Sequence, residues 1–325
     1  MATMQVIDHG AGGGPEVLSV ATRPVPVPAE GEVLIKVAAA GVNGPDLKQR
    51  SGRYPPPPGA SDLIGLEVSG HVAATGGSVT GWSEGDALCA LTNGGGYADY
   101  VAVPAGQCLP VPDGVDIVDA AGLCETFFTV WSNVWFGHDV PDGGTMLVHG
   151  GGGGIGSTAV QLGAAFGQRV FATAGGEASI KLAADMGAHR VINYRDEDFA
   201  EIVAEAGGAD IIVDFLGGPY LALNLKCTRM DTRIIQLAFD LGPKAEINLI
   251  PFLVKRVSLT GAALRPRSPD FKAAVADDLL KRVWPFFADG KLRTVTYKTF
   301  PLAEAAEAHR VLEAGGHPGK VLLTL

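Results

Sequence analysis

The pattern of hydrophobic and polar positions changes near residue 120. Before that point, short runs of apolar or alternating residues lie between glycine and proline turns, which is typical of β-strands. Examples are residues 32–40, 65–75 and 97–104. The pattern predicts an all-β region from residue 1 to about residue 120.

Beyond residue 120, apolar stretches of helical length alternate with short apolar runs. Such alternation is typical of a parallel sheet covered by helices. We therefore predict an α/β protein with a β-rich domain and a doubly wound parallel-sheet domain. The predicted helices are 178–187, 197–207 and 302–315, and the predicted strands are 190–193, 210–217, 233–239, 258–264 and 320–325.

Length, charge and cysteine spacing limit the possible functions. A chain of 325 residues is long enough for two domains. Its net charge of −10 argues against a nucleic-acid partner, because binding to phosphates requires clustered cations. The start of the chain has no basic leader, and no apolar run is long enough to span a membrane, so we expect a cytoplasmic protein. The four cysteines form no CxxC pair, which predicts buried free thiols rather than a zinc knuckle.

The clearest motif is a glycine loop at residues 147–156. Gly151-x-Gly153-x-x-Gly156 follows an apolar strand and precedes a helix. A pyrophosphate must reach backbone N–H groups at a helix N-terminus, where side chains would block it and the helix dipole favours an anion. The motif therefore predicts dinucleotide binding. We expect His149, beside the loop, to be a packed side chain rather than a catalyst.

The residues that follow the next strand indicate which nicotinamide cofactor the protein binds. That strand ends at Thr173, and Ala174 takes the place beside the ribose where NAD enzymes usually have an acidic residue. A site without that carboxylate can accept a 2′-phosphate, so NADPH is favoured. Glu177 lies near the expected spacing for the acid and keeps NADH as the weaker alternative. The candidate phosphate ligands are Lys181, Tyr194 and Arg195.

Three segments resemble a known family. Residues 38–72, 148–162 and 187–199 are similar to the quinone oxidoreductase branch of the medium-chain dehydrogenase/reductase superfamily, especially its tumour-suppressor-inducible quinone oxidoreductase subgroup. The resemblance covers nearly the whole chain. It implies a GroES-like domain made of residues 1–120 and 261–325, a Rossmann domain at 121–260, and a homodimer formed through the cofactor domain.

The same resemblance bears on metal content. Zinc members of the superfamily bind their catalytic metal through a Cys in the segment matching GVNGPD and a His-Glu pair in the segment matching GLE. This chain has Asn43, Leu66 and Glu67 there. Asparagine and leucine are not zinc ligands, so we expect no metal. Without a Lewis acid, the enzyme would favour acceptors that delocalise the incoming electrons, such as quinones and enones.

The resemblance also implies roles for individual residues. Asn43 and Tyr54 would border the nicotinamide, and they are the candidate catalytic residues. One position departs from the family, since Ser179 stands where a lysine usually binds the 2′-phosphate. The remaining implied cofactor contacts are Thr129, Gly153, Gly154, Ile155, Gly156, Tyr194, Phe239, Ala263, Leu264 and Lys320.

Together these features predict a zinc-free NADPH:quinone oxidoreductase. NADPH would lie in the cleft between the domains, and hydride would pass to a quinone or a related conjugated carbonyl. The proton could come from water or from Tyr54. Two alternatives remain, namely an enoyl reductase acting on a thioester or ketone, and an NADPH-binding protein without enzymatic activity.

Overall fold

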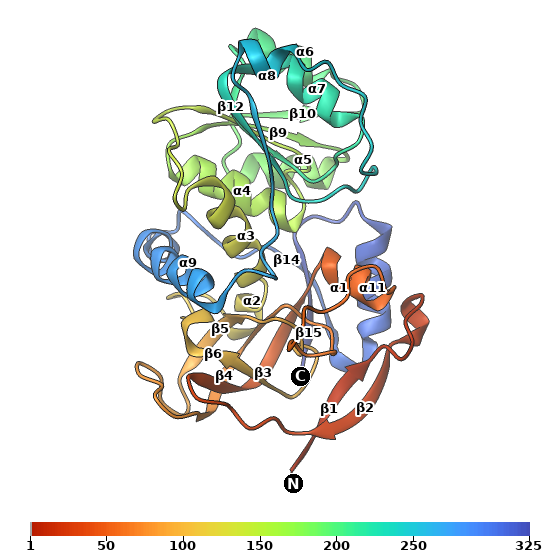
Figure 1. The fold of residues 1–325 in the computed structure, drawn as a ribbon, viewed down its shortest axis with the longest axis vertical. Helices are drawn as coiled ribbons and strands as arrows, with labels where there is room; N and C mark the ends of the chain where they lie inside the picture. The colour runs from red at the N-terminus through yellow and green to blue at the C-terminus, as the bar shows by residue number, and fades with distance from the viewer. Residues whose placement is uncertain (1) are drawn as a thin grey trace. The chain divides into compact units, whose positions relative to one another are not determined.

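The computed structural model describes residues 2–325, and they divide into two compact units (Figure 1). Unit 1 contains the described residues up to Phe128, then Arg265–Gly315 and Gly319–Leu325. Unit 2 contains Thr129–Leu264 and Gly316–Pro318. No helix among residues 2–325 has the length and apolar character needed to cross a membrane.

Unit 1 is built on a seven-stranded sheet. Its strand order is β14-β15-β3-β4-β5-β7, and β6 pairs with the first half of β3. Strands β1 and β2 form a separate antiparallel pair. The strands are β1 (Thr3–Asp8), β2 (Ser19–Pro24), β3 (Glu32–Val42), β4 (Glu67–Thr75), β5 (Ala87–Leu91), β6 (Tyr100–Pro104), β7 (Cys108–Pro110), β14 (Thr296–Pro301) and β15 (Lys320–Thr324).

The register of three neighbouring strands brings distant residues together at one end of this sheet. Asn43 directly follows β3, whose last residue, Val42, pairs with Val321 of β15. On the other side of β3, Ala40 pairs with Val68 of β4. Lys320 and Glu67 are the first residues of β15 and β4, so both lie beside Asn43.

Unit 1 is β-rich, but the prediction of an all-β region before residue 120 was wrong. Helix α1 (Gly44–Arg50) follows β3 directly, and the carboxylate of Asp46 accepts the N–H of Asn43 at its start. The sequence analysis also missed α9 (Pro269–Arg282), where Ser268 caps the first turn and Pro269 opens the helix. The other helices are α2 (Ile117–Ala120), α10 (Pro285–Ala288) and α11 (Ala305–Ala314), with short 3-10 turns at Pro15–Val17, Ala105–Gln107 and Leu302–Glu304.

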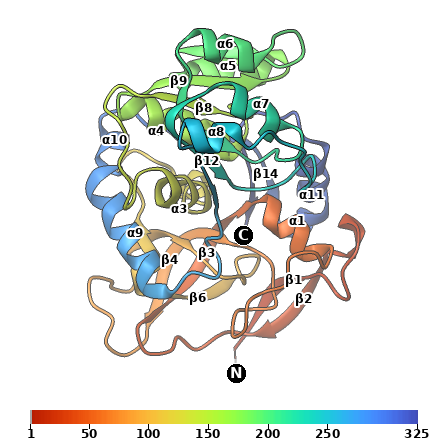
Figure 2. The same ribbon diagram turned by 45° about the horizontal axis from the view of Figure 1, so that its top comes forward.

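Alternating positions of the unit 1 strands form its core. Val33, Ile35 and Val37 of β3 pack with apolar residues of β4, β15 and α11. Burying each such side chain contributes about 1.5–3 kcal/mol. Helix α11 lies beside α1 in both views, and it places the buried His309 within the unit (Figures 1 and 2).

Unit 2 confirms the prediction of a doubly wound parallel sheet. Its six strands are all parallel in the order β10-β9-β8-β11-β12-β13. The order reverses between β8 and β11, and ligands of such sheets bind outside the carboxyl ends of the strands at this switch point. The strands are β8 (Thr145–Val148), β9 (Arg169–Ala174), β10 (Arg190–Asn193), β11 (Ala209–Asp214), β12 (Thr228–Gln236) and β13 (Ser258–Gly261).

The helices of unit 2 follow its strands as the alternating pattern indicated. Helix α4 starts six residues after the end of β8, and Figure 2 labels both within the unit. The described helices are α4 (Gly154–Ala165), α5 (Glu177–Asp185), α6 (Phe199–Glu205), α7 (Tyr220–Lys226) and α8 (Ile250–Val254), while α3 (Cys124–Val134) contains the division between the units.

Candidate active site

The glycine loop lies at the switch point of the unit 2 sheet. It connects β8 to α4, and Gly153 is the N-cap of the helix. Gly154, Ile155 and Gly156 are the first helical residues, whose N–H groups have no partner within an α-helix. The loop therefore presents backbone donors and the positive end of a helix dipole at the ligand-binding edge of the sheet.

Buried hydrogen bonds hold the start of this loop. Asn224 donates its amide to Asp214, so its Oδ1 accepts from Nε2 of His149 at 2.8 Å. Nδ1 of His149 then accepts from the Thr173 hydroxyl at 3.1 Å, and that hydroxyl accepts the N–H of Gly150 at 3.2 Å. Burial lowers the pKa of His149 and keeps the ring neutral. His149 is thus the packed side chain that the sequence analysis expected.

The fold of the loop itself requires glycine at one of its positions. A Cβ at Gly156 would lie 2.1 Å from the carbonyl oxygen of Gly150, which excludes any side chain there without a backbone shift. A Cβ at Gly153 would lie 3.5 Å from its nearest neighbour, which is an ordinary van der Waals contact, so the fold of the loop does not require glycine at this position. Because three of the four residues at the helix start are glycines, their N–H groups are not covered by side chains, and a dinucleotide pyrophosphate fits the residues present.

The region after β9 carries the features relevant to the ribose. Ala174 is buried at the strand tip, and the hydroxyl end of Tyr194 packs against Gly175. Lys181 has an exposed side chain that pairs with Asp185 at 2.6 Å. Ser179, at the position where the family has lysine, is buried and packs against Gly152.

Three other predicted cofactor residues of unit 2 follow strand ends, and a fourth lies in a helix. Phe239 follows β12, is half exposed and packs against Gly217. Ala263 and Leu264 follow β13, and Thr129 lies in α3. Because carboxyl ends of parallel strands meet at one edge of a sheet, Phe239 and Ala263 share that edge with the glycine loop.

A second cluster of polar side chains lies in unit 1, at the strand ends described above. The Glu67 carboxylate is fully buried and accepts from the amide of Asn43 at 2.8 Å and the ammonium of Lys320 at 2.6 Å. Lys320 also donates to Oδ1 of Asn43. A Cβ at residue 41 would lie 2.0 Å from Glu67, so Gly41 leaves the space that this carboxylate occupies.

Asp46 fixes the backbone around this cluster. Its two carboxylate oxygens accept from the N–H groups of Asn43 at 2.8 Å and Gly65 at 3.1 Å. Burial raises the pKa of Asp46 to about 7, although both hydrogen bonds and the charge of Lys320 oppose the rise. Asp46 is therefore a structural residue that orients Asn43.

Glu125, in the first turn of α3, belongs to the same cluster and was missed in the sequence analysis. Its backbone N–H donates to Oε2 of Glu67 at 2.8 Å. Its side chain is partly buried, and burial followed by the charge of Glu67 raises the pKa of Glu125 to about 8. The only signal in the sequence was a single acid within a long apolar stretch.

Tyr54 lies in a neighbouring group of unit 1 residues. The Arg265 guanidinium stacks on its ring, 5.3 Å from the centroid. Arg265 also donates to Gln49 at 2.8 Å and to the carbonyl of Asn93 at 2.7 Å. Burial raises the pKa of Tyr54 above its ordinary value, so its phenol is a weak acid near neutral pH.

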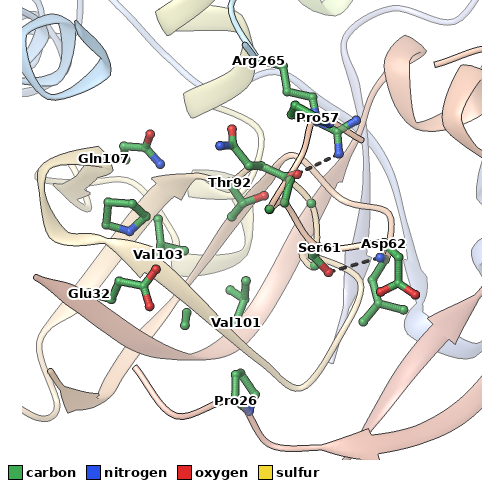
Figure 3. A pocket seen from close by; sticks show the side chains of 18 of the residues that line it. Pro26, Glu32, Pro57, Ser61, Asp62, Thr92, Val101, Val103, Gln107 and Arg265 are labelled. Atoms are coloured by element: carbon green, nitrogen blue, oxygen red, sulfur yellow. Dashed lines mark hydrogen bonds between the residues drawn. The ribbon is translucent and has the colours of Figure 1, made fainter. Parts of the chain in front are cut away.

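Unit 1 also contains an open pocket of about 610 Å³, shown in Figure 3. Thr92, Gln107 and Arg265 are among the residues lining it. Asn43, Tyr54 and Lys320 do not line it. Arg265 connects the two places, because its side chain contacts both the pocket and the ring of Tyr54.

The positions that bind zinc in related dehydrogenases hold Asn43, Leu66 and Glu67 here. An ammonium group of the chain itself, that of Lys320, contacts both Asn43 and Glu67. Across residues 2–325, no group of three or more His, Cys, Asp or Glu side chains is arranged to hold a metal ion. The four cysteines are free and buried.

Comparison with known proteins gives matches over the whole chain. Residues 29–113 match the alcohol dehydrogenase GroES-like domain family, and residues 186–323 match the zinc-binding dehydrogenase family. The quinone oxidoreductase of Rattus norvegicus is 31% identical over 319 residues, covering 96% of this chain and 95% of the rat protein.

Solved structures agree with this assignment. A mycobacterial protein solved in complex with NADPH superimposes with a TM-score of 0.86 at 31% identity, covering 99% of this chain and 100% of the other. A Pseudomonas syringae quinone oxidoreductase gives a TM-score of 0.87 at 26% identity, with 99% and 100% coverage. The chain belongs to the zinc-free quinone oxidoreductase branch of the medium-chain dehydrogenase/reductase superfamily and is an oxidoreductase with a nicotinamide cofactor.

Proposed function

We propose that the protein is an NADPH-dependent oxidoreductase that reduces quinones or related conjugated carbonyls without zinc. The observation that carries the proposal is a glycine loop suited to a pyrophosphate, in a chain whose residues at the zinc-binding positions of related dehydrogenases include Asn43 and Glu67, both in contact with the ammonium of Lys320. The similarity to quinone oxidoreductases along the whole chain supports the choice of acceptor.

In this proposal unit 2 binds the nucleotide. Gly153, Gly154, Ile155 and Gly156 hold the pyrophosphate, and Ala174 leaves room at the ribose for a 2′-phosphate. Tyr194, Lys181 and Arg195 remain the candidates for binding that phosphate, which favours NADPH over NADH. Thr129, Phe239, Ala263 and Leu264 line the nicotinamide. NADPH would supply the hydride.

Unit 1 supplies the groups that act on the acceptor. Asn43, held by Glu67 and Asp46, and Lys320 present a fixed polar surface to the acceptor. Tyr54, held under Arg265, borders the acceptor. Catalysis then depends mainly on positioning, because quinones and enones delocalise the incoming electrons without a Lewis acid.

A second candidate function is reduction of a conjugated thioester or ketone. A mycocerosic acid synthase-like polyketide synthase of Mycobacterium tuberculosis is 30% identical over 300 residues, which are 91% of this chain and 14% of the synthase. The same residues would serve both reactions, since each passes hydride to a conjugated carbonyl.

The test is to titrate NADPH and NADH separately into the protein, following nicotinamide fluorescence, and then to add a para-quinone, an enone or an enoyl thioester. Tighter binding of NADPH with oxidation by the quinone supports the main proposal. Oxidation by the thioester alone supports the second. Binding without oxidation by any acceptor supports an NADPH-binding protein that is not an enzyme.

We also propose that the protein is a homodimer formed through unit 2. Strand β13 is at the edge of the sheet, and its four residues are exposed. Near it in the sequence, α8 exposes Leu253 and Val254. An uncovered edge strand and exposed apolar side chains each favour association with another chain. Light scattering of the purified protein gives its mass and checks this proposal.

A further inference from the structure

The proposed function leaves the proton donor open, and the polar cluster of unit 1 contains several titratable groups that could serve. They are Asp46 on α1, Glu67 on β4, Lys320 on β15, Lys272 on α9, and Tyr54 and Arg265 on loops, together with Glu125 at the start of α3. Their hydrogen bonds distinguish them.

Most of these side chains are committed to other partners. Both oxygens of Asp46 accept backbone N–H groups, and Glu67 accepts from Asn43, Lys320 and the backbone of Glu125. Lys272 is fully buried and donates to the Asn93 side chain and the Arg265 carbonyl. The hydrogen bonds of these three side chains are therefore all made within the protein.

Glu125 differs from them in two respects. Among residues 2–325, its carboxyl group has no hydrogen-bond or salt-bridge partner, and its side chain is only partly buried. The carboxyl group therefore remains free, on a residue whose backbone is hydrogen-bonded to the carboxylate that holds Asn43 and Lys320.

We propose that Glu125 is the general acid that protonates the reduced acceptor. The inference rests on the proposed function, which supplies the hydride and the conjugated carbonyl. The electron pair of the hydride forms a new C–H or O–H bond to the conjugated system, and the displaced π electrons produce an enolate or quinol oxyanion. The O–H bond of Glu125 breaks, its proton bonds to the oxyanion or to the α-carbon, and the carboxylate regains a proton from water.

The acidity of the group suits this role. Burial first, then the charge of Glu67, raises the pKa of Glu125 to about 8, and Asp46 adds to the rise while Lys320 and Lys272 oppose it. A carboxyl group with this pKa is mostly protonated at pH 7, and general acids act best when their pKa lies near the working pH. Tyr54, whose pKa is raised by burial, is the weaker acid of the two.

The experiment is single-turnover oxidation of NADPH by whichever acceptor the wild-type protein reduces fastest, followed from pH 6 to pH 10. The wild-type rate should fall as the pH rises through about 8, because Glu125 then loses its proton. Glu125→Gln, which keeps the shape, should be slower by about 10²-fold at pH 7 and should lose that alkaline limb. Glu125→Asp should restore part of the rate.

The matched control is Glu84→Gln, a change in an exposed turn, which should leave both the rate and the pH profile unchanged. NADPH affinity should be the same in all variants. An alkaline limb that persists in Glu125→Gln overturns the inference, even if the rate falls. If the wild-type protein oxidises NADPH with no acceptor, the proposed function itself is wrong. That outcome is distinct from a persistent alkaline limb, which contradicts only the role of Glu125.

Discussion

The glycine loop of unit 2 and the polar cluster of unit 1 are built by opposite means. The loop uses the backbone of consecutive residues, and the absence of side chains is its main requirement. The cluster uses side chains from separate strands and helices, and Asn43 and Lys320 are 277 positions apart.

The contrast has energetic consequences. The donors of the loop are neutral N–H groups, which cost less to desolvate than charged groups. The cluster buries the Lys320 ammonium against the Glu67 carboxylate, and each ion loses its hydration. Removing one partner from such a pair should therefore be more damaging than a steric change in the loop.

The largest effect we predict is for Lys320→Met. The substitution leaves the carboxylate of Glu67, whose side chain is fully buried, without its cation, which should destabilise the protein by about 3–5 kcal/mol. Urea denaturation measures the change. Adding Glu67→Gln should recover part of the loss, because the uncompensated charge is then gone.

The control for this prediction is Lys36→Met on the neighbouring strand β3, where the lysine is exposed. That change should alter the free energy of unfolding by no more than about 0.5 kcal/mol. Equal losses in Lys320→Met and Lys36→Met would show that the buried pair has no special role.

A smaller effect is expected for Gly156→Ala in the glycine loop. The added Cβ would lie 2.1 Å from the Gly150 carbonyl, so the loop must shift at a cost of about 1–3 kcal/mol. NADPH affinity should fall as the helical N–H groups move. Gly153→Ala, which meets its nearest neighbour at 3.5 Å, should keep the stability of the wild type. Fluorescence titration and thermal unfolding of both variants distinguish a steric requirement from a general sensitivity of the loop.

The same contrast explains what the sequence could predict. The doubly wound sheet and the glycine loop could be predicted because their signals are local, namely apolar periodicity and closely spaced glycines. The hydrogen bonds joining Asn43, Glu67 and Lys320 depend on strand register, which no local pattern contains. Resemblance to a family pointed to Asn43 and Lys320 but not to Glu125, since an acid within an apolar helix gives no sign of its partners.

The smallest effect we predict is for Tyr54→Phe, and it tests which unit 1 residue donates the proton. Removal of a general acid should reduce turnover by about 10²-fold. If Glu125 is the acid, loss of the Tyr54 hydroxyl should reduce turnover by much less than that. The ring would still pack under Arg265, whose guanidinium lies 5.3 Å from its centroid, so acceptor binding should be nearly unchanged. Steady-state kcat and KM for a quinone and an enone provide the measurement. A large fall in kcat at constant KM would instead assign the proton to Tyr54, and the alkaline limb of the wild-type profile would then have to arise from a phenol whose pKa is raised by burial.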